Sequence, residues 1–268
     1  MKYLLLAPSL VACALFAIWP VGELVVISLY RTNFIVSRFV GFANYARAFG
    51  DPVFLRSMLN SLWYAIGMVT LSVGGAVTIA LLVMRERKRW HDVIRVLMYL
   101  PVVAAGIIIS QVWRWIFHSQ GPINWILGMH VQWFAQGVTA IPAIVLIVAT
   151  TGLGGVLIVV LASILGIDTS IYDAAVIDGA PWWMIKLRIV LPMISRTIGV
   201  LVLLTVVAAP QVFETIYALA PFEYAATMGW VIYREAFVMS RHGPAAAMSM
   251  ILLVMMMGVA LVRQRVQR

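Results

Sequence analysis

Residues 171–192 read IYDAAVIDGAPWWMIKLRIVLP and lie between two long apolar runs, residues 138–165 and 197–220. Each of these runs is long enough to cross a bilayer, which takes about 20 apolar residues in a helix. A segment with two aspartates, a lysine and an arginine is too costly to bury in lipid and cannot continue either span. The stretch therefore predicts a polar connection at a membrane surface, between two transmembrane helices.

Within this connection the sequence predicts a helix, a break and a second helix. One of the residues at 168–170 (Asp, Thr, Ser) can cap the first helix. Ala174 and Ala175 keep one face of that helix thin, and Gly179 with Pro181 at a new helix start makes a sharp turn. A short helix with a thin face fits a groove on a partner protein. The alternative, which composition alone favours, is an ordinary connector at the membrane surface.

Outward from this segment, the whole chain has the composition of an integral membrane protein. Of its 268 residues, 63% are apolar and 11% are charged, and the mean hydropathy is +1.01, whereas a soluble domain is typically about a quarter charged. Helices are expected rather than strands, because a lipid-exposed backbone must satisfy its own hydrogen bonds. The predicted fold is all-α, a single membrane domain over residues 1–268 with about six transmembrane helices. The predicted spans are residues 3–30, 58–84, 93–117, 138–165, 197–220 and 245–262, and the connecting segment is 168–195.

The basic residues predict the orientation of these spans. Six crossings put both ends of the chain on one side of the membrane, and twelve of the 19 Lys and Arg residues fall on that side. By the positive-inside rule this side is the cytoplasm, so both termini are predicted to be cytoplasmic. Four arginines between the first two spans weaken the contrast: Arg31, Arg38, Arg47 and Arg56.

The same sequence argues against nucleic-acid binding, metal binding, nucleotide binding by a P-loop and catalysis. The net charge of +9 is read as a determinant of orientation, and no nucleic-acid partner is expected. Cys13 is the one cysteine, and no Cys/His cluster has the spacing of metal ligands, so no metal site is expected. No P-loop motif occurs, so the chain cannot cradle nucleotide phosphates by a P-loop. An intramembrane enzyme would need paired catalytic groups at one depth in the spans, and the predicted spans contain no such pair, so no catalytic residues are expected. An intramembrane enzyme or a membrane assembly factor remains the alternative class of protein.

The polar connection also resembles a family signature, which reads EAA, two residues, DGA, and then a spaced F, I and LP. This is the cytoplasmic signature of the membrane-spanning subunits of binding-protein-dependent ABC importers. The matching residues are Asp173-Ala174-Ala175, Asp178-Gly179-Ala180, Ile189 and Leu191-Pro192, with one acid replacing another at the first position. Two departures bear on packing against the ATPase: Lys186 occupies the usual Phe position, and Arg196 stands where a proline often follows.

The resemblance extends over most of the chain and points to the carbohydrate-uptake branch, to subunits like the first permease of maltose or glycerol-phosphate importers. The residues that carry it are Gly41-Phe42-Ala43-Asn44-Tyr45, Asp51-Pro52-Val53-Phe54, Asn60, Pro101, Trp113, Gly121, Asn124, Tyr233, Phe237 and Ala245-Ala246-Ala247. The Thr-Gly-Gly-Gly-Pro turn that is common after span five is absent, so the solute stays open. A permease of a polyamine, phosphate or peptide importer is the alternative.

The resemblance implies a type I ABC importer permease fold in the bacterial cytoplasmic (inner) membrane. It implies a second permease subunit that completes a heterodimer, two copies of an ATPase subunit, an extracytoplasmic solute-binding protein, and a sugar or sugar-like solute. ATP and Mg are then used by the ATPase subunits, and this chain binds no cofactor. The residues implied in coupling to the ATPases are Tyr172, Asp173, Ala174, Ala175, Asp178, Gly179, Ala180, Ile189, Leu191 and Pro192.

Polar residues inside the predicted spans are candidates for the solute pathway, because burying them in lipid is expensive. Gln211 and Glu214 are three positions apart, hence on one helical face, just after Pro210, which is expected to kink the helix. Nearby Phe213 and Tyr217 add aromatic faces on which a sugar can stack. The alternative is that Gln211 and Glu214 bond to neighbouring helices. Two weaker pathway candidates are Asn60 and Gln111.

Overall fold

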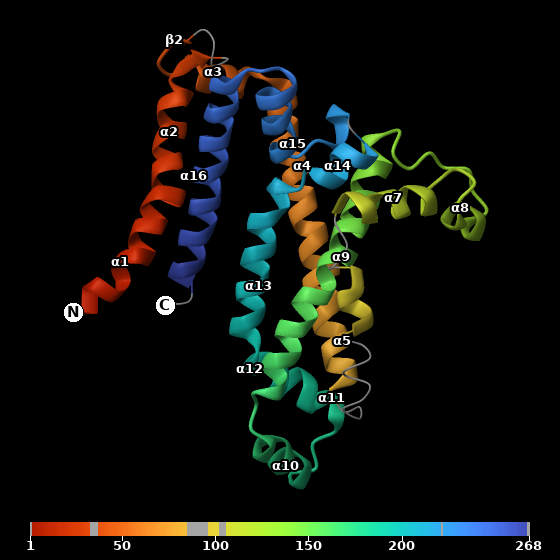
Figure 1. Cartoon of the computed structure of the whole chain (residues 1–268). Coiled ribbons are helices and arrows are strands. Elements are labelled where there is room, and N and C mark those ends of the chain that lie inside the picture. The colour runs from red at the N-terminus through yellow and green to blue at the C-terminus, as the bar shows by residue number, and fades with distance from the viewer. Residues whose placement is uncertain (1, 33–36, 85–95, 102–105, 221, 267–268) are drawn as a thin grey trace. The chain divides into compact units, whose positions relative to one another are not determined.

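The computed structural model describes residues 2–32, 37–84, 96–101, 106–220 and 222–266, and most of these residues are helical (Figure 1). They divide into two compact units: a terminal unit, Met1–Leu59 with Ala226–Arg268, and a central unit, Asn60–Ala225. The helical membrane fold predicted from the composition is confirmed. One strand pair, residues 30–39, was not foreseen.

The terminal unit combines both ends of the chain. Its first elements are α1 (Lys2–Cys13), η1 (Ala14–Ile18), α2 (Trp19–Ser28), β1 (Tyr30–Thr32), β2 (Ser37–Phe39), α3 (Ala43–Gly50) and the start of α4 (Pro52–Met68). Its last elements are α15 (Met228–Tyr233), η6 (Arg234–Val238) and α16 (His242–Val266). The strands β1 and β2 are antiparallel, with Tyr30 opposite Phe39, Arg31 opposite Arg38 and Thr32 opposite Ser37.

The central unit contains the rest of α4 and the chain that follows it as far as Ala225. Its first elements are η2 (Val69–Gly74), α5 (Gly75–Val83), α7 (Gly106–Ile116), α8 (Pro122–Leu127) and α9 (Gly137–Leu165). Its last are α10 (Thr169–Ile177), α11 (Trp182–Met184), η3 (Ile185–Val190), α12 (Leu191–Met193), α13 (Ser195–Ala208), η4 (Ala209–Gln211), α14 (Glu214–Leu219) and η5 (Glu223–Ala225).

Four stretches of described helix are long and apolar enough to cross a membrane: Ala7–Ser28, Pro52–Val83, Gly137–Leu165 and His242–Arg263. A fifth is possible if the bent pair Trp182–Met193 and Ser195–Gln211 forms one span. The predicted third span, residues 93–117, lies partly outside the described residues, and only α7 represents its second half. The count of six spans therefore stays a prediction.

The predicted fifth span, residues 197–220, is broken into two helices where only a kink at Pro210 was expected. Helix α13 ends at Ala208, a single 3-10 turn follows through Pro210, and α14 begins only at Glu214. Proline lacks an N–H and its ring displaces the preceding turn, so it ends the α-helical hydrogen-bond ladder here. The backbone of Phe213 then leaves the helical region, with φ −132° and ψ −38°. Gln211 and Glu214 thus lie on different elements, and the single helical face proposed for them does not exist.

Small residues allow close packing in the terminal unit, in which α16 lies beside α2 and α3 (Figure 1). Ala245, Ala246 and Ala247 are buried near the start of α16 and let its neighbours come close. A Cβ on Gly243 would collide with the carbonyl oxygen of Tyr30, so only glycine fits there. These contacts explain the triple alanine that the sequence shows before the last span.

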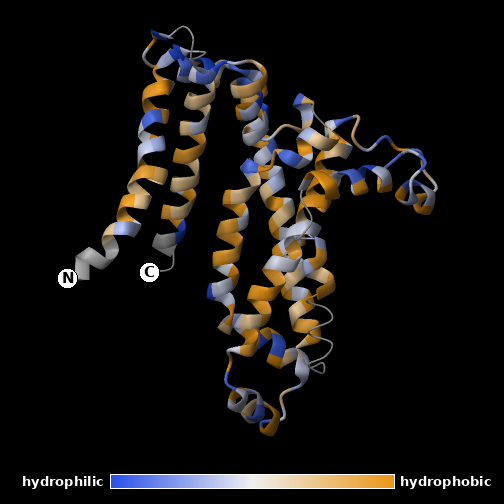
Figure 2. Cartoon of the chain, in the orientation of Figure 1, coloured by the Kyte–Doolittle hydropathy of each residue, from blue (hydrophilic) through white to orange (hydrophobic). Residues whose placement is uncertain are grey.

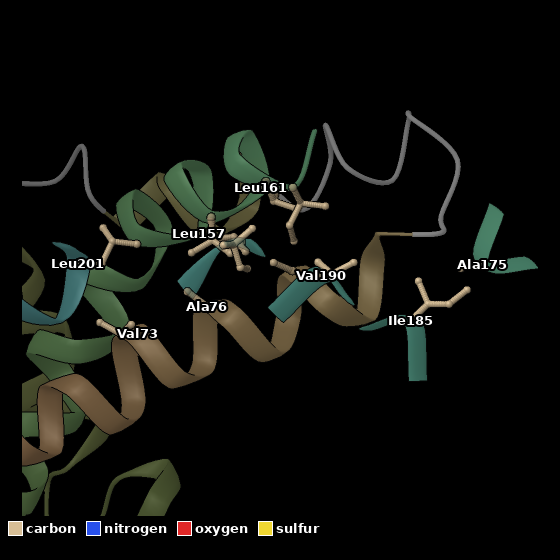
Figure 3. Packing of buried hydrophobic residues seen from close by; sticks show 12 residues of the cluster. Val73, Ala76, Leu157, Leu161, Ala175, Ile185, Val190 and Leu201 are labelled. Carbon is tan, nitrogen blue, oxygen red and sulfur yellow. The ribbon is translucent and has the colours of Figure 1, made fainter. Parts of the chain in front are cut away.

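An apolar cluster forms the core at one end of the central unit (Figure 3). It joins η2, α5, α9 and α13, all parts of candidate spans, to the connection that contains α10 and η3. Residues of the cluster labelled in the figure are Val73, Ala76, Leu157, Leu161, Ala175, Ile185, Val190 and Leu201. Burial of apolar surface contributes roughly 25 cal/mol per Å², so this cluster fixes the polar connection to the spans.

Candidate functional site

The candidate coupling site begins with a capped helix, α10. The Asp168 carboxylate accepts a hydrogen bond from the Ser170 N–H at 2.9 Å and so caps the helix. This hydrogen bond, which favours the charged carboxylate, holds the pKa of Asp168 below its usual range. Of the three capping candidates at residues 168–170, the structure selects Asp168. The predicted order of helix, break and second helix is observed, with α10, the turn at Gly179 and α11 in sequence.

The signature Asp178-Gly179-Ala180 forms the turn that ends α10. Gly179 has φ +75°, a left-handed conformation that other residues adopt only at a cost. The Gly179 N–H donates to the Val176 carbonyl and the Ala180 N–H to the Ala175 carbonyl, each at 3.0 Å. This pair of bonds is a Schellman motif, which satisfies the last carbonyls of a helix and reverses the chain. The glycine of the DGA sequence is thus explained by local backbone geometry.

The inner face of α10 anchors the coupling site to the central unit. Ala175 is 7% exposed and lies in the apolar cluster of Figure 3 with Ile185 and Val190. Tyr172, Ala180 and Ile189 pack against the same cluster and are partly buried. Burial raises the pKa of the Tyr172 phenol, whose oxygen has no hydrogen-bond partner among the described residues. Leu191 and Pro192 form α12, the last short helix before α13.

The outer face of α10 is solvent-exposed in this chain. Asp173, Ala174 and Asp178 are exposed, and so are two apolar side chains, Val176 at 56% and Ile177 at 85%. These two were missed in the sequence because they lie between the signature residues. The sequence did contain a signal for their exposure. Val176 and Ile177 are β-branched apolar residues beside the two alanines, in a segment that is too polar to be buried in lipid. An exposed apolar tip next to two carboxylates is a surface suited to a protein partner.

The two departures from the family signature follow the turn at Gly179 in the sequence. Lys186 is partly exposed in η3, and Arg196 is exposed in the first turn of α13. Neither side chain belongs to the cluster that anchors α10. The cluster residues that anchor α10 are apolar, and the effect of Lys186 and Arg196 on packing against an ATPase stays a prediction.

The four main pathway candidates surround the break after Pro210. The Gln211 amide donates to the Val207 carbonyl of its own helix at 2.9 Å, which replaces part of the ladder lost at the proline. Glu214 is the first residue of α14, and its carboxylate packs against Gly106, the first residue of α7. A Cβ added to Gly106 would lie only 2.6 Å from Glu214 Oε2. Tyr217 is 52% exposed, and Phe213 is partly buried. Gln211, Glu214 and Tyr217 thus remain accessible for a solute or a second subunit.

The two weaker pathway candidates differ in their surroundings. Asn60 is buried, and its amide donates to the Tyr224 carbonyl at 3.0 Å, a bond that connects α4 with the loop after α14. Gln111 is exposed on α7. The observed bond gives Asn60 a structural role in the central unit, while its part in a solute pathway stays a prediction.

Two asparagines of the family resemblance have structural roles that sequence reasoning did not assign. The amide of Asn44 donates to the carbonyls of Ser28 at 2.8 Å and Tyr30 at 2.9 Å, and so fixes the end of α2. Asn124 is buried and bonds to the backbone of Val131 in both directions and to the Trp133 ring N–H. Asn44 fixes the chain that follows the candidate span Ala7–Ser28, and Asn124 fixes the segment between α8 and α9.

The described residues contain no group of three or more His, Cys, Asp or Glu side chains that could hold a metal ion. Several apolar helices with a short, capped helix fixed to them define an integral membrane protein. No protein-family model matches the chain. Individual relatives do match it over nearly its whole length.

The inner membrane ABC transporter permease protein YcjO of Escherichia coli is 30% identical over 274 residues, which cover 98% of this chain and 92% of that protein. The trehalose/maltose transport system permease protein MalF of Thermococcus litoralis is 30% identical over 224 residues, 81% and 76% of the two chains. A chain in the crystal structure of a bacterial alginate ABC transporter bound to its periplasmic protein has a TM-score of 0.86 at 23% identity, and covers 100% and 93%.

These relatives show that the chain belongs to the family of ABC transporter permeases. It is an integral protein of the inner membrane and a non-catalytic transport subunit. The likeness to the alginate transporter chain shows that the fold is that of an importer permease.

Proposed function

We propose that the chain forms one half of the translocation pathway of an ATP-driven, binding-protein-dependent importer for a sugar or sugar-like solute. The relative MalF from Thermococcus litoralis, named for trehalose and maltose transport, supports the solute class. The partners are a second permease subunit, two ATPase subunits that use ATP and Mg, and an extracytoplasmic solute-binding protein. Both termini lie in the cytoplasm, as the distribution of Lys and Arg indicates.

The observation that carries this proposal is the two-sided character of α10. Its inner face, with Ala175, is fixed to the spans through an apolar cluster, while Val176 and Ile177 project outward. A helix attached in this way moves with the spans as one body, so closure of a bound ATPase pair is transmitted to the pathway. The proposed coupling residues are Tyr172, Asp173, Ala174, Ala175, Asp178, Gly179, Ala180, Ile189, Leu191 and Pro192, to which we add the exposed Ile177.

The proposal is tested by an Ile177→Asp substitution in the reconstituted complex. A charge on this apolar tip should weaken docking, and solute-stimulated ATP hydrolysis and uptake should fall at least tenfold. Ile126→Asp is the matched control, because Ile126 is also highly exposed but lies on α8, outside the coupling site. Normal stimulated hydrolysis in the Ile177 variant, or an equal loss in the Ile126 variant, would contradict the assignment. The solute itself is identified from the ligand that co-purifies with the cognate binding protein.

A further inference from the structure

Four arginines line a hollow of the terminal unit that neither the pathway nor the coupling site uses. The hollow has a volume of about 420 Å³ and is lined by Arg31, Arg38, Arg47 and Arg241, together with Thr32 and Ser240 among others. Arg31 and Arg38 come from the strand pair, Arg47 from the last turn of α3, and Arg241 from the residue before α16. Segments more than 190 positions apart in the sequence thus bring positive charge to one place.

The strand register makes this gathering of charge costly. Arg31 and Arg38 are direct cross-strand partners, and the Thr32 and Ser37 hydroxyls hold that register with a 2.7 Å hydrogen bond. Like charges directly opposite each other destabilise a strand pair. Ser240 adds a second strained feature, because it is the only non-glycine residue with positive φ, 52°, in the described part of the chain. Strain of this kind often accompanies a binding site.

The carboxylates near the hollow do not neutralise it. Glu235 is 4% exposed and lies 3.4 Å from an Arg234 nitrogen and 3.7 Å from an Arg241 nitrogen, so one acid faces two arginines. Among the described residues, no ion pair joins Arg31, Arg38 or Arg47 to a carboxylate. Three exposed guanidinium groups therefore remain without a counter-charge, and a bound anion would remove the repulsion between them.

The position of the hollow indicates which anion it receives. It lies beside the ends of two candidate spans, Ala7–Ser28 and His242–Arg263, where a membrane surface is expected. Figure 2 shows hydrophilic residues around β2 and α3, directly next to the apolar lengths of α2 and α16. Phe39 and Phe42 at this level are 63% and 76% exposed, as aromatic residues at a membrane interface often are. The anion that is always present at this depth is the phosphate of a lipid headgroup.

We propose that Arg31, Arg38, Arg47 and Arg241 form a binding site for the phosphate group of an anionic phospholipid. The planar guanidinium group binds phosphate oxygens through two parallel hydrogen bonds, which suits arginine better than lysine to this task. The lipid anchors the hairpin β1–β2 and the start of α16 to the membrane surface. The site also explains why these arginines stand on the side of the membrane where the positive-inside rule disfavours them.

The test measures lipid retention by the assembled transporter in nanodiscs of phosphatidylcholine with increasing amounts of phosphatidylglycerol. Native mass spectrometry counts the phosphatidylglycerol molecules that stay bound after extraction. The double variant Arg31→Gln with Arg38→Gln should need a higher phosphatidylglycerol fraction for the same retention, by about fivefold for each arginine removed. Arg56→Gln is the matched control, because Arg56 is exposed on α4 and does not line the hollow. Unchanged retention in the double variant, or equal loss in the control, would overturn the proposal.

A second variant, a competition with inorganic phosphate and a docking measurement complete the test. Arg31→Lys with Arg38→Lys keeps the charge, so it provides the measurement if the glutamine variant does not assemble, and its retention should be intermediate. Inorganic phosphate at millimolar concentration should not displace the lipid, because it lacks contact with the exposed aromatic residues; displacement would assign the site to free phosphate and refute the lipid. Weaker docking of the solute-binding protein with unchanged lipid retention would assign the arginines to a protein partner and refute it equally.

Discussion

Gly179 carries the turn on which the coupling site depends. Substitution by alanine forces a Cβ into a left-handed conformation at a cost of about 1–2 kcal/mol, whereas asparagine tolerates this conformation better. We expect Gly179→Ala to lower solute-stimulated ATP hydrolysis and uptake, and Gly179→Asn to retain more of both. The measurement is uptake into proteoliposomes at equal amounts of assembled complex. Open space surrounds the position, so crowding does not explain a loss; identical activity of all three proteins would show that the turn is only a connector.

Asn44 is the second residue whose role is specific enough to test. Its buried amide donates two hydrogen bonds to the carbonyls at the end of α2, and Asn44→Ala leaves both acceptors without this donor. Stability should fall by about 1–3 kcal/mol, seen as a lower melting temperature of the complex. Asn44→Asp has the same shape without the donor and should lose a similar amount. A normal melting temperature for the aspartate variant would show that the amide bonds are not responsible.

The sequence revealed these two residues to different degrees. Gly179 could be assigned to a sharp turn directly, because glycine followed by Ala-Pro is a local signal and the bonds of the turn span five residues. Asn44 was visible only as part of a family resemblance. Its partners, the carbonyls of Ser28 and Tyr30, lie 16 and 14 positions away and reach it only through the hairpin. Local patterns cannot encode such a contact.

At the scale of elements, the helix break at Pro210 separates Gln211 and Glu214, which were predicted to share one helical face. A kink was foreseen there, but α13 ends completely and α14 restarts at Glu214 in a new direction. Hydropathy did not show this, because apolar residues continue on both sides of the break, with Val206 and Val207 before it and Ile216 and Leu219 after it. The signature turn at Gly179 was predictable for the opposite reason, since its polarity and its glycine both mark a break.

Glu214 can be tested as part of α14. Loss of a hydrogen bond to a charged group costs about 1.5–3 kcal/mol, so Glu214→Ala should raise the solute concentration for half-maximal uptake by roughly 10-fold or more. Glu214→Gln should fall between wild type and alanine, and Gln211→Ala should have a smaller effect, because the Gln211 amide already bonds to its own helix. Uptake is measured against solute concentration, alongside the melting temperature. An unchanged concentration dependence with a lower melting temperature would assign Glu214 to the contact with α7.

At the scale of the whole molecule, composition alone predicted a helical membrane protein and the signature residues indicated the family; the structure and the relatives confirm both. The pairing of the helices could not be predicted. Helices such as α9 are apolar on all sides, so the sequence of a single chain does not show which face meets a neighbour. Short polar clusters such as the hollow between Arg31 and Arg241 are invisible for the same reason, because their members come from both ends of the chain.

The division of labour between subunits gives the last prediction. The purified chain alone should hydrolyse no ATP, because its sequence contains no P-loop to hold nucleotide phosphates. Extracted gently from its native membrane, it should instead co-purify with a second permease and an ATPase pair, since the apolar tip of α10 at Val176 and Ile177 is exposed until a partner covers it. ATP hydrolysis by the isolated chain and by the complex is compared at equal concentration, with an ATPase-inactive complex as the control. A homodimer of this chain that transports solute without ATP would refute both the assignment of energy to a partner and the coupling role of α10.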